Sequence, residues 1–291
     1  MRKGILLAGG KGTRLHPLTK IINKHFLSIY DKPMFYYPLS TLMLMDIKEI
    51  LIISNEEDLP LFRKILGSGN KLGLNLEYSI QENPNGVAEA FIIGESFIKN
   101  NLSALILGDN IFHGNQLTKQ FKNISKQEYG ASVLACPVNN PESYGIVEFD
   151  NMGKVLDIVE KPANPKSKYA LTGLYLFDKT VVEKAKQISK SSREEYEITD
   201  INKLYLKEGS LHVNLMSRGM AWLDTGTCES MHDASNYIKT LQQRQGILIG
   251  CPEEIAWRKG WINDQELESL FKPLIKTNYG LYLESLLKNN L

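Results

Sequence analysis

The chain lacks the features of several protein classes. Its three cysteines, Cys136, Cys228 and Cys251, are widely spaced and form no C-x-x-C pair, which excludes a disulfide framework and argues against a cysteine zinc site. The 34 basic and 33 acidic side chains leave a formal net charge of +1, which gives no support to a nucleic-acid binder. No apolar run approaches the roughly 18 residues of a membrane span. We therefore expect a cytoplasmic protein with neither a membrane nor a nucleic-acid partner.

What is present is a composition typical of a globular protein, with 291 residues of which 43% are hydrophobic. The first half alternates short apolar runs with helix-like segments. The expected strands are Lys3–Ala8, Glu49–Ser54, Leu74–Ile80 and Ser103–Leu107. The expected helices are Tyr36–Met45, Glu57–Leu66 and Val87–Ile98. Continuous apolar strands that alternate with helices predict an α/β fold, with a Rossmann-like, mostly parallel sheet covered on both faces.

The second half has a different pattern. Turn residues separate Gly145–Phe149 from Lys154–Glu160, which predicts a β-hairpin. Further strands are expected at Ala170–Phe177 and Leu211–Met216, and a helix at Glu229–Gln245. From Pro252 onward we expect short helices, with Trp257 and Trp261 one helical turn apart on an apolar face. We expect a catalytic domain at 1–246 and a C-terminal helical segment at 247–291.

A glycine-rich loop follows the first expected strand, in the run Leu7-Ala8-Gly9-Gly10-Lys11-Gly12-Thr13-Arg14. Glycines past a strand let the backbone approach a ligand and point N–H groups at phosphate oxygens. The loop matches neither the Walker A pattern nor the dinucleotide fingerprint. A glycine loop alone is more often only a tight turn, but two cations, Arg14 and Lys24, favour a polyphosphate ligand.

Several motifs together resemble the sugar-1-phosphate nucleotidylyltransferases, and among them the glucose-1-phosphate thymidylyltransferase family. The segments that carry this resemblance, in order, are the glycine loop with Pro17-Leu18-Thr19 and Lys24, Asp31–Met34, Tyr36–Ser40, Gly108–Asn110, Glu160–Pro162, Trp222–Gly226 and Glu253–Arg258 with Gly260-Trp261. They extend over essentially the whole chain. The resemblance implies a nucleotide-diphospho-sugar transferase fold, with a nucleotide half at about 1–110 and a sugar-binding half at about 111–226.

The resemblance implies a reaction in which dTTP and α-D-glucose 1-phosphate give dTDP-glucose and diphosphate. Two anions meet in this reaction, so positioning and charge neutralisation supply most of the catalysis. The residues it implies for catalysis are Arg14, Lys24, Asp109, Lys161 and Asp224. Asp109 and Asp224 would hold a Mg²⁺ ion, which takes few protein ligands, all of them oxygens. From spacing alone, each aspartate is more often a turn residue or a helix cap.

The resemblance also implies binding residues for the two substrates. The nucleotide would contact Leu7, Ala8, Gly9, Gly10, Gly12, Thr13, Gln81, Pro84 and Gly86. The sugar would contact Tyr144, Gly145, Glu160, Lys161, Thr172, Gly173 and Trp222. An amide at Gln81 can pair with the edge of thymine or uracil. It further implies a homotetramer, and an inhibitory pocket for an end-product nucleotide sugar that includes Arg218, Glu254, Ile255 and Arg258.

Two segments depart from the family pattern. His25 stands where an amide is usual, in Lys24-His25-Phe26-Leu27-Ser28, and Ser28 replaces a proline. Glu89 stands where glutamine is usual and would bring a carboxylate to the nucleotide side. Neither change removes a catalytic charge, so we expect activity to be retained. Any difference from the family would lie in which nucleotide base or which sugar the enzyme accepts.

Two other functions remain alternatives, and a third is disfavoured. A transferase that uses UTP or CTP would differ only in its base and hexose contacts. A non-catalytic nucleotide-sugar sensor could have the same fold, but it would not need both metal carboxylates. A kinase would need a differently built phosphate loop.

Overall fold

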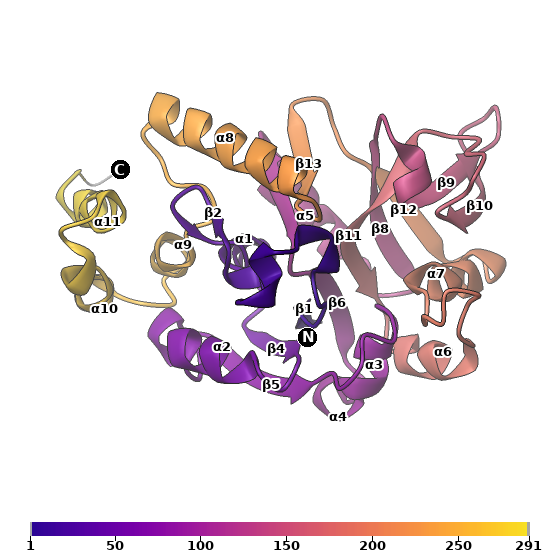
Figure 1. The fold of residues 1–291 in the computed structure, drawn as a ribbon, viewed down its shortest axis with the longest axis horizontal. Helices are drawn as coiled ribbons and strands as arrows, with labels where there is room; N and C mark the ends of the chain where they lie inside the picture. The colour runs from indigo at the N-terminus through magenta and orange to yellow at the C-terminus, as the bar shows by residue number, and fades with distance from the viewer. Residues whose placement is uncertain (1, 290–291) are drawn as a thin grey trace.

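The computed structural model describes residues 2–289 and is built around one nine-stranded sheet (Figure 1). Seven strands follow one another in the order β10-β9-β11-β6-β1-β4-β5, while β8 pairs with β11 and β12. The first-half strands are β1 (Arg2–Leu7), β4 (Glu49–Ser54), β5 (Asn75–Ile80) and β6 (Leu102–Leu107). All of their mutual pairings are parallel. The predicted mostly parallel sheet is confirmed for this half.

Helices cover both faces of the sheet because its strands are apolar on both sides. In β1, Leu6 belongs to one buried cluster, whereas Ile5 and Leu7 belong to the other. The Leu6 face is covered by α1 (Tyr36–Leu44), α2 (Leu59–Leu66) and α5 (Leu117–Ser125). The opposite face is covered by α3 (Glu89–Ile93), α4 (Glu95–Ile98), α6 (Val181–Gln187) and α7 (Ile198–Lys207).

The second half extends the sheet mainly with antiparallel pairings, although β12 runs parallel to β8. Its strands are β8 (Ala131–Pro137), β9 (Gly145–Phe149), β10 (Val155–Glu160), β11 (Tyr169–Phe177) and β12 (Leu211–Leu215). β11 runs antiparallel to β6 and joins the two halves, and β9 and β10 form the predicted hairpin.

Two short pairings lie outside the main sheet and had no clear signal in the sequence. β7 (Asn110–Gly114) pairs antiparallel with β13 (Met220–Asp224), and β2 (Ser28–Ile29) pairs with β3 (Lys32–Pro33). α8 (Cys228–Gln245) packs on this region. Short 3₁₀ helices complete the fold at Thr13–Leu15, Leu18–Lys20, Lys24–Phe26, Asn70–Leu72, Pro141–Ser143 and Lys272–Leu274.

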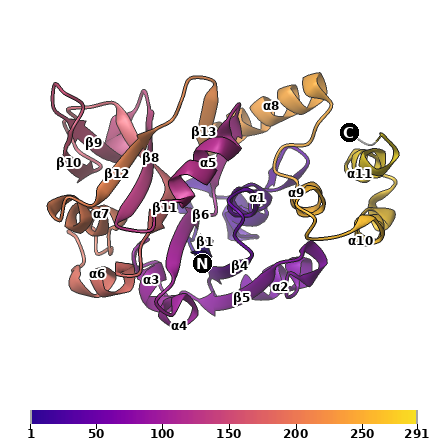
Figure 2. The same cartoon turned by 180° about the vertical axis from the view of Figure 1, so that it is seen from behind.

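The C-terminal helices are α9 (Pro252–Arg258), α10 (Asp264–Phe271) and α11 (Asn278–Asn289). α10 and α11 lie at the opposite end of the molecule from the β9–β10 hairpin, as both views show (Figures 1 and 2). Residues 290–291 of the expected C-terminal segment lie outside the described residues. No helix within residues 2–289 has the length and hydropathy needed to cross a membrane.

Two expectations were wrong in detail. The single helix predicted over Val87–Ile98 is divided into α3 and α4 at Gly94, where a Cβ would come within 2.9 Å of the Ala90 carbonyl oxygen. α9 ends at Arg258, so Trp261 follows the helix and does not share its face with Trp257. Both tryptophans nevertheless pack against the core, because tertiary contacts and not helical spacing bring them there.

Candidate active site

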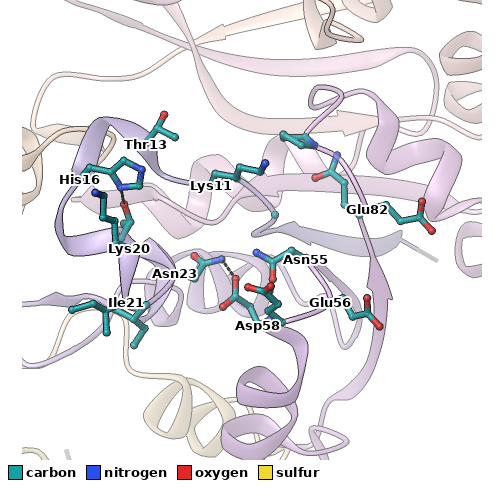
Figure 3. A pocket seen from close by; sticks show the side chains of 17 residues that line it. Lys11, Thr13, His16, Lys20, Ile21, Asn23, Asn55, Glu56, Asp58 and Glu82 are labelled. Atoms are coloured by element: carbon teal, nitrogen blue, oxygen red, sulfur yellow. Dashed lines mark hydrogen bonds between the residues drawn. The ribbon is translucent and has the colours of Figure 1, made fainter.

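Two cavities open at the carboxyl ends of the parallel strands, where ligands of such sheets bind. The larger, of about 520 Å³, is bordered by the glycine loop after β1 and by the segments after β4 and β5 (Figure 3). It contains five of the residues predicted to bind the nucleotide: Gly9, Gly10, Thr13, Gln81 and Pro84. Lys11, Thr13 and His16 extend the wall along the loop in Figure 3.

The glycine loop is shaped by short-range contacts. Gly12 has a φ of +60°, a conformation that favours glycine, and its carbonyl accepts a 2.7 Å hydrogen bond from the Thr19 hydroxyl. Leu7, Ala8, Gly12 and Gly86, also predicted to bind the nucleotide, are not among the residues that line the larger cavity. Leu7 and Ala8 are buried at the end of β1, so they anchor the start of the glycine loop.

The second cavity, of about 330 Å³, lies between the glycine loop and the second half of the chain. Nine predicted residues line it: Arg14, Asp109, Tyr144, Gly145, Glu160, Lys161, Gly173, Trp222 and Asp224. The glycine loop thus borders both cavities, with Thr13 in one wall and Arg14 in the other. A triphosphate held by this loop would end beside the second cavity.

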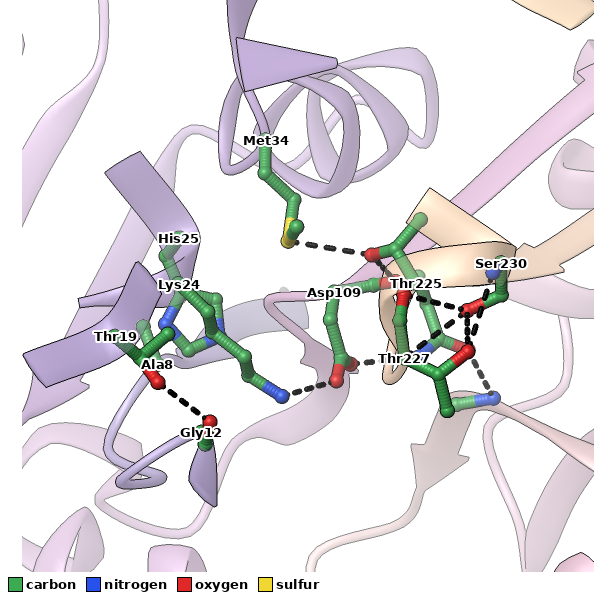
Figure 4. Close-up of polar contacts among 12 residues, drawn as sticks. Ala8, Gly12, Thr19, Lys24, His25, Met34, Asp109, Thr225, Thr227 and Ser230 are labelled. Atoms are coloured by element: carbon green, nitrogen blue, oxygen red, sulfur yellow. Dashed lines mark hydrogen bonds and ion pairs between the residues drawn. The ribbon is translucent and has the colours of Figure 1, made fainter. Parts of the chain in front are cut away.

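The two predicted metal carboxylates are brought together by the β7–β13 pairing. Asp224 lies opposite Asn110 in its register, and Thr225 ties the two strands through its hydroxyl, which donates a 2.7 Å hydrogen bond to the Asp109 carbonyl oxygen (Figure 4). Lys24 forms an ion pair with the Asp109 carboxylate. Within residues 2–289, no cluster of three or more His, Cys, Asp or Glu side chains could hold a metal. Any metal here would therefore have two protein carboxylates as ligands.

The two carboxylates differ in their electrostatic surroundings. Burial favours the neutral form of Asp109, but the Lys24 ammonium and hydrogen bonds from Lys24 and Asn110 lower its pKa below the usual range. Burial and the nearby Asp109 charge raise the pKa of Asp224 to about 6, against the opposing effect of Lys24, Arg14 and Lys161. A bound cation would relieve the repulsion between the two aspartates. The donor set, two carboxylates with hard oxygen atoms that line the second cavity, fits Mg²⁺.

Asn110 lines the second cavity and connects several of its residues, although the sequence analysis predicted no separate role for it. Its Nδ2 donates to Asp109 Oδ1 at 2.9 Å, and its Oδ1 accepts from Trp222 Nε1 at 2.5 Å and from the Gly173 amide at 2.9 Å. The Tyr144 ring meets Trp222 edge-on, with ring centroids 5.1 Å apart. One amide side chain therefore holds Asp109, a predicted metal ligand, together with Trp222 and Gly173.

The predicted sugar-binding side of the second cavity centres on Glu160. Its Oε2 accepts a 2.6 Å hydrogen bond from the Thr199 hydroxyl, and its Oε1 lies 3.3 Å from Arg193. A Cβ on Gly145 would come within 3.1 Å of Glu160 Oε2, so glycine leaves this carboxylate accessible. Lys161 follows with a φ of +42°, a strained conformation for a non-glycine residue that often occurs at functional sites.

The sequence did not identify several residues of this wall. Arg193, Glu195, Glu197 and Thr199 line the second cavity, but they lie in and before α7, more than 30 residues from Glu160, and no local motif marks them. Thr172, which was predicted to bind sugar, is buried and does not line the cavity. Its neighbour Gly173 does.

The predicted regulatory residues are divided. Glu254, Ile255 and Arg258 line a third cavity of about 270 Å³, together with Tyr37 and His113. Arg218 is exposed and is not among the residues that line it.

His25, which departs from the family pattern, is a buried residue next to Lys24. Its ring nitrogen Nδ1 lies 2.6 Å from Asn23 Oδ1. Asn23 Nδ2 donates to Asp58 Oδ2 at 2.5 Å (Figure 3), which fixes the amide, so His25 carries its proton on Nδ1. Burial and the adjacent Lys24 charge lower the pKa of His25 to about 3 and keep the ring neutral.

Comparison with known proteins agrees with this geometry. The family model described as nucleotidyl transferase matches residues 3–240. The chain belongs to the nucleotidyl transferase family, and it is an enzyme of that class.

Its relatives are more specific. A glucose-1-phosphate thymidylyltransferase of Xanthomonas campestris pv. campestris (strain B100) is 51% identical over 287 residues, which cover 99% of this chain and 97% of that protein. One of Mycobacterium tuberculosis (strain ATCC 25618 / H37Rv) is 48% identical over 291 residues, or 99% of this chain and 100% of that protein. The predicted membership of the glucose-1-phosphate thymidylyltransferase family is confirmed.

Solved structures confirm the predicted fold class. A Bacillus anthracis protein assigned as a glucose-1-phosphate thymidylyltransferase, in complex with a sucrose, superposes with a TM-score of 0.75 and 41% identity, and the match covers 81% of this chain and 95% of that one. UDP-glucose pyrophosphorylase with UDP-glucose gives a TM-score of 0.71 at 25% identity, covering 83% of this chain and 100% of that one.

Proposed function

We propose that this enzyme transfers the thymidylyl group of dTTP to α-D-glucose 1-phosphate, giving dTDP-glucose and diphosphate. The observation that carries the proposal is that Arg14, Asp109, Lys161 and Asp224 line one cavity, which adjoins a larger one across the glycine loop. The names of the two relatives described above supply the base and the sugar. The first half would serve the nucleotide and the second half the sugar.

In the proposed reaction a phosphate oxygen of the sugar phosphate attacks the α-phosphorus of dTTP in line, and the bond from that phosphorus to the departing diphosphate breaks. Arg14 would stabilise the charge on the diphosphate. Lys24 would reach the same phosphates, and Lys161 would offset the incoming sugar phosphate. Bringing two anions together requires such fixed positive charge.

Asp109 and Asp224 would hold a Mg²⁺ ion, which supplies further charge neutralisation at the phosphates when bound. The hydrogen bonds from Thr225 and Asn110 hold Asp109 in place beforehand. Lys24, which pairs with the Asp109 carboxylate, would add its positive charge at the triphosphate beside these two residues.

Glu160 would accept hydrogen bonds from sugar hydroxyls, while Gly145 and Gly173 let the hexose approach the main chain. The edge-on pair of Tyr144 and Trp222 would form the apolar wall that a sugar ring requires.

The experiment is release of diphosphate in the presence of Mg²⁺ and glucose 1-phosphate, with dTTP, UTP, CTP, ATP and GTP compared side by side. We expect the highest kcat/KM with dTTP and a sugar nucleotide as the second product. Preference for UTP or CTP would support the alternative transferase. No turnover with any nucleotide, while nucleotide sugars still bind, would support a sensor.

We also propose that the cavity of Glu254, Ile255 and Arg258 binds an end-product nucleotide sugar and that the enzyme acts as a homotetramer in the synthesis of dTDP-deoxysugars such as dTDP-rhamnose. The C-terminal helices would supply the subunit contacts. Inhibition by dTDP-rhamnose that persists unchanged in Arg258→Ala would contradict the regulatory site. Light scattering of the purified protein tests the tetramer.

A further inference from the structure

The carboxylate of Glu89 lies behind the predicted base-binding amide of Gln81. Gln81 Nε2 donates a 2.8 Å hydrogen bond to Glu89 Oε2 and a longer one, of 3.4 Å, to the Gly86 carbonyl oxygen. A carboxylate and a carbonyl can only accept hydrogen bonds, so the end of the amide that faces them must be the NH₂ group. Both of its hydrogens are used there.

The other end of the amide faces the glycine loop. Gln81 Oε1 lies so close to Gly9 that a Cβ on that glycine would come within 2.5 Å of it. Both residues line the larger cavity, whereas Glu89 does not. Gln81 therefore offers this cavity an acceptor and no donor.

Further contacts hold Glu89 in this orientation. Its second oxygen, Oε1, accepts a 2.8 Å hydrogen bond from Asn85 Nδ2, and Asn85 Oδ1 accepts one of 2.9 Å from Lys190. The ammonium can only donate, which fixes the Asn85 amide in turn. Each polar atom between Lys190 and Gln81 has a single allowed role.

The backbone of the same loop is fixed as well. The Tyr196 amide donates to the Asn85 carbonyl at 2.6 Å, and the Ala88 amide donates to the Tyr196 carbonyl at 3.1 Å. Gly86 has a φ of +112°, and a Cβ there would come within 2.5 Å of the Tyr196 oxygen. The Gly86 carbonyl is thus held in place as the second acceptor for Gln81.

We propose that Glu89 is a positioning residue that determines base specificity, by holding Gln81 as an acceptor for the N3–H group of thymine or uracil and against cytosine. Thymine and uracil carry a hydrogen on ring nitrogen N3, which Oε1 accepts. Cytosine presents a lone pair at N3, which Oε1 repels. This inference rests on the proposed function in that the larger cavity holds the base.

A glutamine at position 89, by contrast, could present either an oxygen or an amino group to Gln81. The Gln81 amide could then turn round and accept both kinds of base. The carboxylate at position 89 removes that freedom, which gives this departure from the family pattern a function.

The test compares kcat/KM for dTTP and dCTP, with glucose 1-phosphate and Mg²⁺ held constant, in wild type, Glu89→Gln and Glu89→Lys. Loss of a fixed buried hydrogen-bond partner changes binding by about tenfold or more. We expect the dTTP to dCTP ratio to fall by at least about tenfold in Glu89→Gln, with thermal unfolding little changed. A lysine at 89 can only donate, so Glu89→Lys should turn the Gln81 amide round and favour dCTP further.

Glu95→Gln is the matched control, because Glu95 in α4 pairs with Lys186 and does not contact Gln81. It should leave the ratio unchanged. Should Glu89→Lys not fold, Asn85→Asp, which removes a donor to Glu89, should lower the ratio in the same direction as Glu89→Gln.

Failure of this inference is distinguishable from failure of the proposed function. Wild type that turns over dTTP, with a Glu89→Gln ratio equal to that of wild type, overturns the role of Glu89 and leaves the function intact. Wild type without turnover overturns the function. The inference is then decided by calorimetric binding of dTTP and dCTP to the same variants, and equal selectivity in wild type and Glu89→Gln, or no binding of either nucleotide, overturns it.

Discussion

The Thr225 hydroxyl donates a 2.7 Å hydrogen bond to the main-chain carbonyl of Asp109, which lies 116 residues earlier in the chain. Thr225 is fully buried, and its amide donates to the same carbonyl at 3.1 Å. This contact sets the relative position of Asp109 and Asp224, because Thr225 immediately follows the second aspartate.

Replacing Thr225 with valine keeps the shape of the side chain but removes this hydroxyl. We expect the Mg²⁺ concentration for half-maximal rate to rise several-fold, because the two carboxylates are less well aligned, and the free energy of unfolding to fall by about 1 kcal/mol. Thr225→Ser keeps the hydroxyl and should retain the wild-type metal requirement. An unchanged metal dependence in Thr225→Val would show that the strands alone align the carboxylates.

Gly173 provides a second test, on the sugar side. A Cβ at this position would lie 2.5 Å from Asn110 Oδ1, so alanine would displace Asn110 and with it Trp222. We expect the KM for glucose 1-phosphate to rise about tenfold or more in Gly173→Ala, since a small misplacement of positioning groups is costly. The KM for dTTP should change much less, and equal effects on both substrates would contradict the division of the site into two cavities.

His25 should make stability depend on pH. Its pKa is lowered to about 3 in the folded protein, whereas the ordinary value is about 6.5. Between these values the unfolded chain binds a proton that the folded protein does not, so stability is complete above about pH 6.5 and decreases as the pH falls. At pH 5 the protonation of His25 in the unfolded chain should therefore lower the free energy of unfolding by about 2 kcal/mol.

The measurement is urea unfolding at pH 7 and pH 5 for wild type and His25→Gln. The glutamine does not titrate, so its variant should lose less stability over this range. Equal losses in the two proteins would mean that His25 is protonated or solvated in the folded state.

The parallel half of the fold was predictable because its strands are continuous apolar runs. Glu49–Ser54 was predicted with the bounds that β4 has in the structure. The residues that form the glycine loop were likewise adjacent in the sequence, so a local motif was enough to identify them.

Other parts depend on contacts between distant segments. The β7–β13 pair consists of two five-residue strands, which are too short to give a clear periodic signal, yet it brings Asp109 and Asp224 together. Asn110 was visible only as part of Gly108-Asp109-Asn110, because its partners Trp222 and Gly173 come from other strands. Arg193 joins Glu160 only through tertiary structure. Spacing alone also placed Trp261 on a helix that ends before it.

We propose that Asp109 and Asp224 act together in the transfer step and not in holding the fold. The most direct test is the single-turnover rate of dTTP with glucose 1-phosphate and Mg²⁺ in Asp109→Asn and Asp224→Asn, measured beside calorimetric binding of each substrate. We predict that each variant loses about 10³-fold or more in rate while it remains folded and binds glucose 1-phosphate within a few-fold of wild type. A variant that retains a rate within about tenfold of wild type would contradict the claim.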